Sequence, residues 1–323
     1  MGSGERADIV LEVRDDTEVL SIPLPELFSW SAMLSYLARS SDETLYRISD
    51  GAVTKLFHEH GETTLVRFQY VLGQTAAFPS SAHRLEASFL APNGEVPSPR
   101  MKALVRRFAE EWFDLDRDLT DFYALAQRDS LLRGAVEEFH GLRIVGIPDL
   151  FEALCWGIIG QQINLSFAYT LKKRFTEAFG RQMERDGEIF WAFPKPEDVA
   201  ELQVPDIAAL QMTARKSEYL IGAAKALADR SIDKATLLNG GWAQAERHLL
   251  AMRGIGPWTA HYVLMRCLRM PEALPAADVG LHHAIRVAAA MDRKPTEAEV
   301  REFAKAWAGW EAYATFYLWR TLY

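Results

Sequence analysis

The chain has 323 residues, of which 49% are hydrophobic and 25% are charged, proportions typical of a folded soluble protein with two or three domains. No apolar run approaches the ~18 residues needed to cross a bilayer, and the N-terminus has no apolar signal core. We therefore expect no membrane partner and a cytoplasmic location. The net charge of −8 argues weakly against a nucleic-acid partner, because DNA-binding proteins usually present a basic face.

Basic residues are nevertheless concentrated in the C-terminal half. Two clusters are 172–174 and 215–216. Between Trp242 and Met270 there is one acid, Glu246, against four arginines: Arg247, Arg253, Arg266 and Arg269. Composition alone leaves the partner undecided. The two cysteines lack the spacing of a zinc or cluster site, which predicts two buried thiols in a reducing cytosol and no cofactor bound through them.

The first hundred residues mix strand and helix signals. Residues 9–13 form a short β-rich run, and 64–72 alternate as a half-buried strand does. Between them, a helical pattern starts at Pro25 and ends near 40–41. The stretch 91–99 is rich in proline and other breakers, which predicts a domain boundary there.

From about Met101 onward the sequence predicts one helix after another. Most of the expected helices begin at a side chain able to cap them, and two of the caps are followed after three residues by the glutamate of a capping box. The expected helices are 149–160, 164–179, 213–228, 296–307 and 311–323. We therefore predict an α+β fold, with a small α/β domain in 1–100 and a mostly helical region in 101–323.

The most specific segment is a helix–turn–helix pattern over 249–260. One helix ends at about Met252, the chain turns through Gly254-Ile255-Gly256, and a second helix starts with Pro257 in its first turn. Glycines permit positive φ and close approach, and the free N–H groups of a helix N-terminus attract a DNA phosphate. A plain helical hairpin has the same glycine turn, so the glycines alone leave both interpretations open.

A second segment, 274–281, places Asp278 beside small residues in a proline-bounded loop that enters a helix. Taken alone, this aspartate is best interpreted as a helix N-cap. Taken together, the glycine turn of 254–256 and the Leu-Pro-x-x-Asp pattern of 274–278 resemble the helix-hairpin-helix superfamily of DNA glycosylases. A helix-entry site can also hold a catalytic carboxylate, so both interpretations of Asp278 stand.

Within that superfamily the chain is most similar to the AlkA-type 3-methyladenine DNA glycosylase II family. The resemblance extends from about Phe28 to Tyr323 and includes 151–153, 160–161 and the aromatic run 307–319. It implies a mixed-sheet N-terminal domain beside two helical subdomains, with the base-binding cleft between the helical parts. It also implies a partner, double-stranded DNA containing alkylated bases, a monomeric enzyme acting at the bacterial nucleoid, and no required cofactor.

The resemblance assigns Asp278 as the catalytic residue, where a carboxylate stabilises the oxocarbenium-like sugar or orients the attacking water. It places Trp258, Tyr262, Trp319 and Tyr36 around the flipped base. Electron-rich rings attract a positively charged alkylated purine by about 0.5–2 kcal/mol per contact. Because such a base is already a good leaving group, we expect no elaborate acid and a broad substrate range.

The expected phosphate contacts belong to the hairpin: Arg253, Gly254, Gly256 and Thr259. Backbone carbonyls of Leu250, Met252 and Gly254 lie where related hairpins hold a monovalent cation. Where the close relative inserts an apolar wedge into DNA, this chain has Gln162 followed by Ile163, and either residue fits that role.

Superfamily members that also nick DNA carry a lysine just after the glycine turn, whose amine forms a Schiff base. Trp258 occupies that position here, which predicts a monofunctional enzyme that releases alkylated purines such as 3-methyladenine and 7-methylguanine. Two alternatives remain: a non-catalytic helix-hairpin-helix DNA-binding protein, and a glycosylase for deaminated or oxidised bases. The second would rely on hydrogen-bonding pocket residues rather than on aromatic rings.

Overall fold

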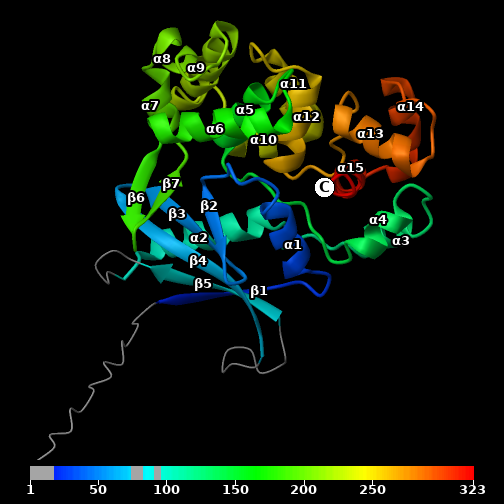
Figure 1. Ribbon diagram of the computed structural model, residues 1–323, viewed down its shortest axis with the longest axis horizontal. Helices are drawn as coiled ribbons and strands as arrows, with labels where there is room; N and C mark the ends of the chain where they lie inside the picture. The colour runs from blue at the N-terminus through cyan, green and yellow to red at the C-terminus, as the bar shows by residue number, and fades with distance from the viewer. Residues whose placement is uncertain (1–17, 74–82, 91–95) are drawn as a thin grey trace, which may run out of the picture.

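The computed structural model describes residues 18–73, 83–90 and 96–323. The expected strand at 9–13 lies outside these ranges. A five-stranded sheet and a larger helical region make up the described chain (Figure 1). The predicted α+β class is confirmed. No helix in the described ranges has both the length and the apolar character of a membrane span.

The N-terminal sheet has the strand order β1-β5-β4-β3-β2. Every strand pair described in it is antiparallel, so the expectation of a mixed sheet was wrong. Tight turns such as His60-Gly61 join successive strands, and a parallel pair would need a crossover of a dozen or more residues. The strand expected at 64–72 is confirmed as part of β4. The strands are β1 (Val19–Pro23), β2 (Tyr46–Ser49), β3 (Ala52–Glu59), β4 (Glu62–Leu72) and β5 (His83–Leu90).

Two helices accompany this sheet. Helix α1 (Trp30–Leu37) begins after the N-cap Ser29, later than the helical pattern from Pro25 predicts, and ends before Ser40. Helix α2 (Pro99–Trp112) starts at the N-cap Ser98 and packs its aromatic face on the sheet. The hydrophobic core of the sheet therefore includes α2, which follows the breaker-rich stretch 91–99, and the division of the chain at residue 100 stays a prediction.

Helix α1 starts late because the chain before it is still held by the sheet. The N–H of Leu24, the residue after β1, donates to the carbonyl of His83 at the start of β5 (3.1 Å). Leu24 also precedes Pro25, and the residue before a proline is disfavoured in the helical conformation. Both effects keep this part of the chain extended, so the helix begins only after the Ser29 cap.

The region from residue 113 onward is mostly helical, as expected. Figure 1 shows α5 and α12 between the α7–α9 group on one side and the α13–α15 group on the other. The helices are α3 (Thr120–Ala126), α4 (Arg133–Glu138), α5 (Leu150–Ile159), α6 (Leu165–Phe179), α7 (Pro196–Ala200), α8 (Val204–Ala208), α9 (Ala214–Ala228), α10 (Lys234–Asn239), α11 (Gly241–Ala251), α12 (Pro257–Arg266), α13 (Val279–Ala288), α14 (Glu297–Ala304), the 3₁₀ turn η1 (Lys305–Trp307) and α15 (Glu311–Arg320).

The helical region also contains a β-hairpin that the expectation of helix after helix missed. Strands β6 (Arg181–Arg185) and β7 (Glu188–Ala192) pair antiparallel and lie beside β3 (Figure 1). Asp186 and Gly187 form the turn, both with positive φ. An Asp-Gly pair between two short runs is the sequence signal for such a hairpin. Phe190 of β7 packs in a small core with Leu56 and Leu65 of the sheet.

The predicted helix starts are confirmed by their caps. Asp149, Asn164, Thr213 and Thr296 each accept the N–H of the residue three positions on, at 2.6 to 3.2 Å. Of the two expected capping boxes, the one at α14 is complete, because Glu299 binds back to the cap. The expected box at α5 is incomplete because the side chain of its glutamate is recruited by a lysine of α6.

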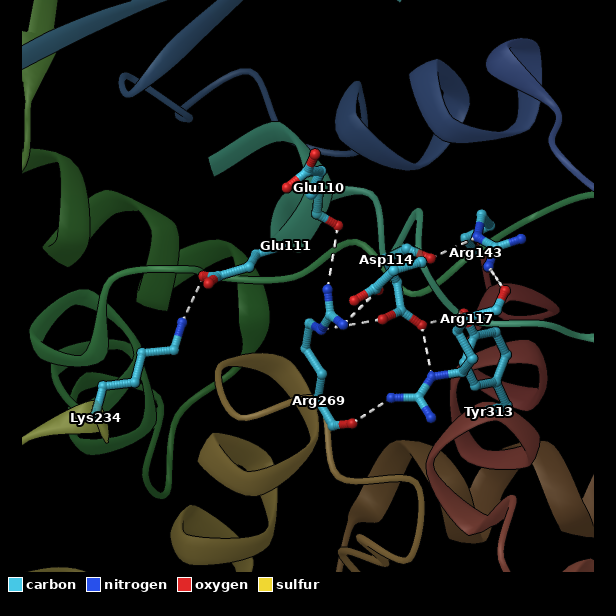
Figure 2. A network of polar contacts seen from close by, with 9 residues as sticks. Glu110, Glu111, Asp114, Arg117, Arg143, Lys234, Arg269 and Tyr313 are labelled. Carbon is cyan, nitrogen blue, oxygen red and sulfur yellow. Dashed lines mark hydrogen bonds and ion pairs between the residues drawn. The ribbon is translucent and has the colours of Figure 1, made fainter. Parts of the chain in front are cut away.

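A buried carboxylate joins the end of α2 to the helical region (Figure 2). Asp114 is 1% exposed, and its carboxylate accepts hydrogen bonds from Arg117 Nε (2.9 Å) and from the Tyr313 hydroxyl of α15 (2.6 Å). Arg269 Nε, just after α12, lies 3.1 Å from the other carboxylate oxygen. Arg143 Nε donates to the Asp114 main-chain carbonyl (2.8 Å). One residue therefore fixes α12 and α15 relative to the sheet.

We predict that Asp114→Asn lowers the free energy of unfolding by about 3 kcal/mol or more, because it leaves Arg117 without its counter-charge and leaves Arg269 with only the exposed Asp116. Denaturant unfolding at neutral pH measures the change. Glu302→Gln is the control, since Glu302 pairs with Lys305 on the surface and should change stability by less than about 0.5 kcal/mol. A loss below about 1 kcal/mol for Asp114→Asn would contradict this role.

Candidate active site

The glycine turn between α11 and α12 has the expected hairpin form. Gly254 has φ +90°, and a Cβ there would lie 2.3 Å from the Tyr219 ring, so only glycine fits. Gly256 has φ −92°, so of the two glycines only Gly254 uses the positive φ that glycine permits. A Cβ at Gly256 would meet nothing within 4 Å. The open side of the turn is therefore at Gly256.

The N-terminus of α12 is suited to an anion. Pro257 occupies the first turn, and the N–H groups of Trp258 and Thr259 have no acceptor within the helix. The Thr259 hydroxyl is not available, because Thr259 is 1% exposed and accepts a hydrogen bond from Gln161 Nε2 (3.0 Å). Only the backbone of Thr259 can therefore serve the expected phosphate contact.

Gln161 organises this turn and was missed as a functional residue at the sequence level. Its Nε2 group donates both to Thr259 Oγ1 and to the Gly254 carbonyl (2.8 Å), which ties the end of α5 to the hairpin. The signal present in the sequence was the Gly160-Gln161 pair, which indicated only a resemblance to the family. The hydrogen bonds explain why an amide is suited to this position.

A groove of about 690 Å³ runs along the open side of the hairpin, between the end of α5, the start of α9 and the Asp278 loop. Arg215, Lys216 and Arg301 line it, against one acid, Glu297. Arg253, beside the groove on the hairpin, is exposed and pairs with Glu218 (2.9 Å). The groove thus presents a local excess of positive charge on a chain of net charge −8.

The arginines of 242–270 do not all contribute to this surface. Arg266 is 3% exposed, and Arg269 pairs with the buried Asp114. Within the basic cluster 172–174, Lys172 is also buried. Counting arginines along the sequence therefore overestimated the local field, because part of the charge is used inside the protein.

Asp278 is held by three N–H donors. It is the N-cap of α13, where its Oδ1 accepts from Leu281 N (2.7 Å), which confirms the helix-cap interpretation. Trp319 Nε1 donates to the same oxygen (2.8 Å), and Trp258 Nε1 donates to Oδ2 (2.7 Å). A carboxylate has about four acceptor sites, so roughly one remains on Oδ2 for a substrate atom or water. The carboxylate is fixed in orientation and half-buried.

The loop before Asp278 is anchored to the hairpin through a histidine. His261 Nδ1 accepts from Leu274 N (3.1 Å), and its Nε2 lies 2.8 Å from Glu246 of α11. After the loop, a Cβ at Gly280 would lie 3.0 Å from Asp278 Oδ1, so a larger residue there would press on the carboxylate. These contacts restrict where Asp278 can lie relative to α12.

The structure brings three of the four expected pocket residues together at Asp278. The rings of Trp258 and Tyr262 are 5.7 Å apart, and those of Tyr262 and Trp319 are 6.2 Å apart, each pair tilted by 32°. Tyr36 lies deeper and is 2% exposed. The role of all four rings in holding a base stays a prediction.

Arg266 lies behind these rings, and sequence reasoning gave it no such role. Its Nε donates to the Val145 carbonyl (2.6 Å), and its Nη1 lies 2.9 Å from the hydroxyls of both Tyr36 and Tyr262. The guanidinium is also 5.4 Å from the Tyr262 ring centre and 5.5 Å from that of Tyr36. An internal cation thus already interacts with two of the rings expected to attract a cationic base.

The two wedge candidates differ in their surroundings. Gln162 is exposed in the groove with φ +58°, an uncommon conformation for a residue with a side chain. Ile163 is half-buried and packs against the core. Gln162 is therefore the freer of the two to enter DNA, and its assignment as the wedge stays a prediction.

We predict that Gly256→Asp weakens binding to undamaged and abasic duplexes alike by roughly tenfold, because it places a negative side chain where a phosphate approaches the helix N-terminus. Fluorescence anisotropy measures the affinity after circular dichroism confirms folding. Gly134→Asp is the matched control, since Gly134 is an exposed glycine in the first turn of α4 with nothing near its Cβ position. If the Gly256 variant bound these duplexes as tightly as the wild type, the hairpin would have a structural role and would not bind a phosphate.

Comparisons with known proteins agree with this geometry. Residues 155–309 match the HhH-GPD superfamily of base excision DNA repair proteins, and residues 59–154 match the 8-oxoguanine DNA glycosylase N-terminal domain. A DNA-3-methyladenine glycosylase of Bacillus subtilis (strain 168) is 45% identical over 306 residues, which cover 95% of this chain and 98% of the relative.

Two solved structures share the fold. The 3-methyladenine DNA-glycosylase from Archaeoglobus fulgidus matches with a TM-score of 0.76 at 23% identity, covering 93% of this chain and 97% of that one. The Clostridium acetobutylicum 8-oxoguanine glycosylase/lyase in complex with double-stranded DNA matches with a TM-score of 0.67 at 18% identity, covering 91% of each chain. On the strength of the 45% identity over nearly its whole length, the chain belongs to the DNA-3-methyladenine glycosylase family, within the HhH-GPD superfamily of base excision DNA repair proteins.

Proposed function

We propose that this glycosylase hydrolytically releases alkylated purines, such as 3-methyladenine and 7-methylguanine, from double-stranded DNA. The observation that carries the proposal is the Asp278 carboxylate, fixed by Trp258 and Trp319 beside a helix-hairpin-helix groove. The name of the Bacillus subtilis relative supports the substrate class. A monomeric state and action on the bacterial chromosome in the cytoplasm stay predictions.

In the proposed mechanism, the flipped nucleotide places its glycosidic bond near the free acceptor site of Asp278. As the bond breaks, positive charge develops on the sugar, and the fixed carboxylate stabilises it and orients the attacking water. Because the indole N–H groups already hold the carboxylate, little reorganisation is needed when the charge develops. An alkylated purine leaves readily, so this arrangement needs no acid to protonate the base.

In this proposal, the hairpin and the groove bind the DNA phosphate backbone, whether or not the DNA is damaged. The N–H groups at the start of α12 would hold a phosphate, and Arg253, Arg215 and Lys216 would add charge. The carbonyls of Met252 and Gly254 each accept one N–H donor, from Ile255 and Gln161. Each keeps a second lone pair, so these two carbonyls and that of Leu250 fit a monovalent cation, which would neutralise charge at the phosphate.

A second candidate function, release of deaminated or oxidised bases, is favoured by one observation. Such neutral bases are recognised through hydrogen bonds, and the hydroxyls of Tyr36 and Tyr262 both accept from Arg266 Nη1, which leaves their own O–H groups able to donate. Excision of a base from DNA containing only hypoxanthine or 8-oxoguanine lesions, at a rate above that for methylated DNA, would establish this function in place of the first. An absence of excision from every substrate would leave a DNA-binding protein without activity.

We predict that the wild type releases 3-methyladenine and 7-methylguanine from methylated DNA, identified by chromatography, and that Asp278→Asn loses excision by about 100-fold or more. Asparagine keeps the helix cap, but its amide nitrogen would face an indole N–H, so neither charge nor orientation is preserved. Asp233→Asn is the control, since Asp233 is the N-cap of α10 and accepts from Thr236 N (2.8 Å). If Asp278→Asn kept the single-turnover rate of the wild type, Asp278 would be a helix cap without a catalytic role.

We further predict that borohydride traps no covalent complex between this protein and damaged or abasic DNA, because Trp258 occupies the position of the Schiff-base lysine. Gel electrophoresis under denaturing conditions measures trapping, with a bifunctional glycosylase as the positive control. A trapped species, for instance through Lys216 in the groove, would contradict a monofunctional enzyme.

A further inference from the structure

A small polar cavity is lined on one side by Tyr262, whose ring contacts the two indoles that hold Asp278. Its volume is about 40 Å³, and it lies between α1 and β2 of the sheet domain and helices α5, α6 and α12. Because about 10–15 Å³ accommodates one water, the cavity admits a small group and not a purine ring system. Its polar and charged lining residues include Arg39, Glu43, Glu152, Tyr169, Lys172 and Arg266.

One hydroxyl in the wall of this cavity has no partner. Tyr169 is 2% exposed, and its hydroxyl makes no hydrogen bond with any described residue. Burial raises the pKa of this phenol, and the charge of Arg39 opposes the shift only in part, so the hydroxyl stays protonated and able to donate. A buried hydroxyl without a partner is costly, which indicates a ligand or a water in the cavity.

The other groups in the wall divide into paired and unpaired charges. Lys172 bridges two carboxylates, those of Glu43 (3.1 Å) and Glu152 (2.9 Å). Arg39 and Arg266, by contrast, form no ion pair with a carboxylate in the described ranges, and they contact tyrosine rings and carbonyls instead. The groups left without an ionic partner are therefore all donors.

The cavity is connected to the catalytic site through one side chain. Tyr262 lines the cavity and also contacts Trp258 and Trp319, which hold Asp278. A base stacked at these rings would have its sugar near Asp278 and its far edge toward the cavity. Only the group that projects from that edge would enter, which matches the small volume.

We propose that the cavity receives the exocyclic oxygen of a flipped 6-oxopurine, and that Tyr169 donates to it as a specificity-determining residue. This inference rests on the proposed function and names a substrate class within it. The cationic groups around the cavity favour an acceptor with partial negative charge over an exocyclic amino group, which is a donor. This hydrogen bond favours excision of 7-methylguanine and hypoxanthine beyond what aromatic stacking alone provides.

The test is Tyr169→Phe, assayed by the ratio of 7-methylguanine to 3-methyladenine released from one methylated DNA sample. We expect this ratio to fall about threefold to tenfold, the effect of one lost hydrogen bond. Both bases are cationic, and at C6 7-methylguanine carries an oxygen, whereas 3-methyladenine carries an amino group. The ratio is independent of the concentration of active enzyme. Excision of hypoxanthine, which is neutral but carries the same oxygen at C6, should fall by a similar factor. This result would show that the variant affects recognition of the oxygen and not of the positive charge.

Thr176→Val is the matched control. Thr176 lies on the same helix, is fully buried, and also has a hydroxyl without a partner among the described residues, but it does not line the cavity. Removing this hydroxyl should leave the ratio unchanged. Thermal unfolding of both variants checks the fold, and each should be at least as stable as the wild type in the absence of DNA if its hydroxyl is unsatisfied.

The outcomes are distinct. An unchanged ratio, or a larger loss for 3-methyladenine, would overturn the proposal and leave the cavity as a site for water only. A wild type that releases 3-methyladenine but no 6-oxopurine would overturn it as well, while the proposed function stands. A wild type that releases neither base would contradict the proposed function itself.

Discussion

The arrangement of the candidate active site depends on the buried carboxylate of Asp114. Its partners Arg269 and Tyr313 belong to the segment after α12 and to α15, the helices that carry Trp258 and Trp319. Those two indoles reach Asp278 from different helices, so their joint contact requires a fixed relation between α12 and α15. Breaking a charge pair inside a protein is costly, so the Asp114 contacts keep α12 and α15 in this relation as long as the protein is folded.

Charge in this protein is divided between buried contacts and the basic groove beside the hairpin. Arg266, Arg269 and Lys172 are largely buried, whereas Arg253 and Arg215 are exposed. An acidic protein can therefore still bind a polyanion, because a few surface cations beside helix N-termini act locally while distant acids are screened within about 10 Å. Net charge was a weak guide here for this reason.

The sequence predicted what local rules determine. The caps at Asp149 and Thr296, the turn at Gly254 and the cap at Asp278 follow from one residue and its near neighbours. Long-range relations could not be predicted in the same way. Nothing local to Arg266 indicates that the chain would bring Tyr36, 230 positions away, to its guanidinium. The resemblance implied a mixed sheet, whereas the short turns at Asp50-Gly51 and His60-Gly61 permit only antiparallel pairs between the strands they join.

Recognition of the base, as proposed, would combine two effects of similar size. A cation–π contact contributes about 0.5–2 kcal/mol and a hydrogen bond about 0.5–1.5 kcal/mol, so neither alone separates one purine from another by much more than tenfold. Because Arg266 already interacts with the Tyr262 ring, attraction of a cationic base falls mainly to Trp258 and Trp319. An oxygen-binding cavity behind Tyr262 would then extend the range toward neutral bases. Modest, partly opposing preferences of this kind would suit an enzyme that removes several lesions rather than one.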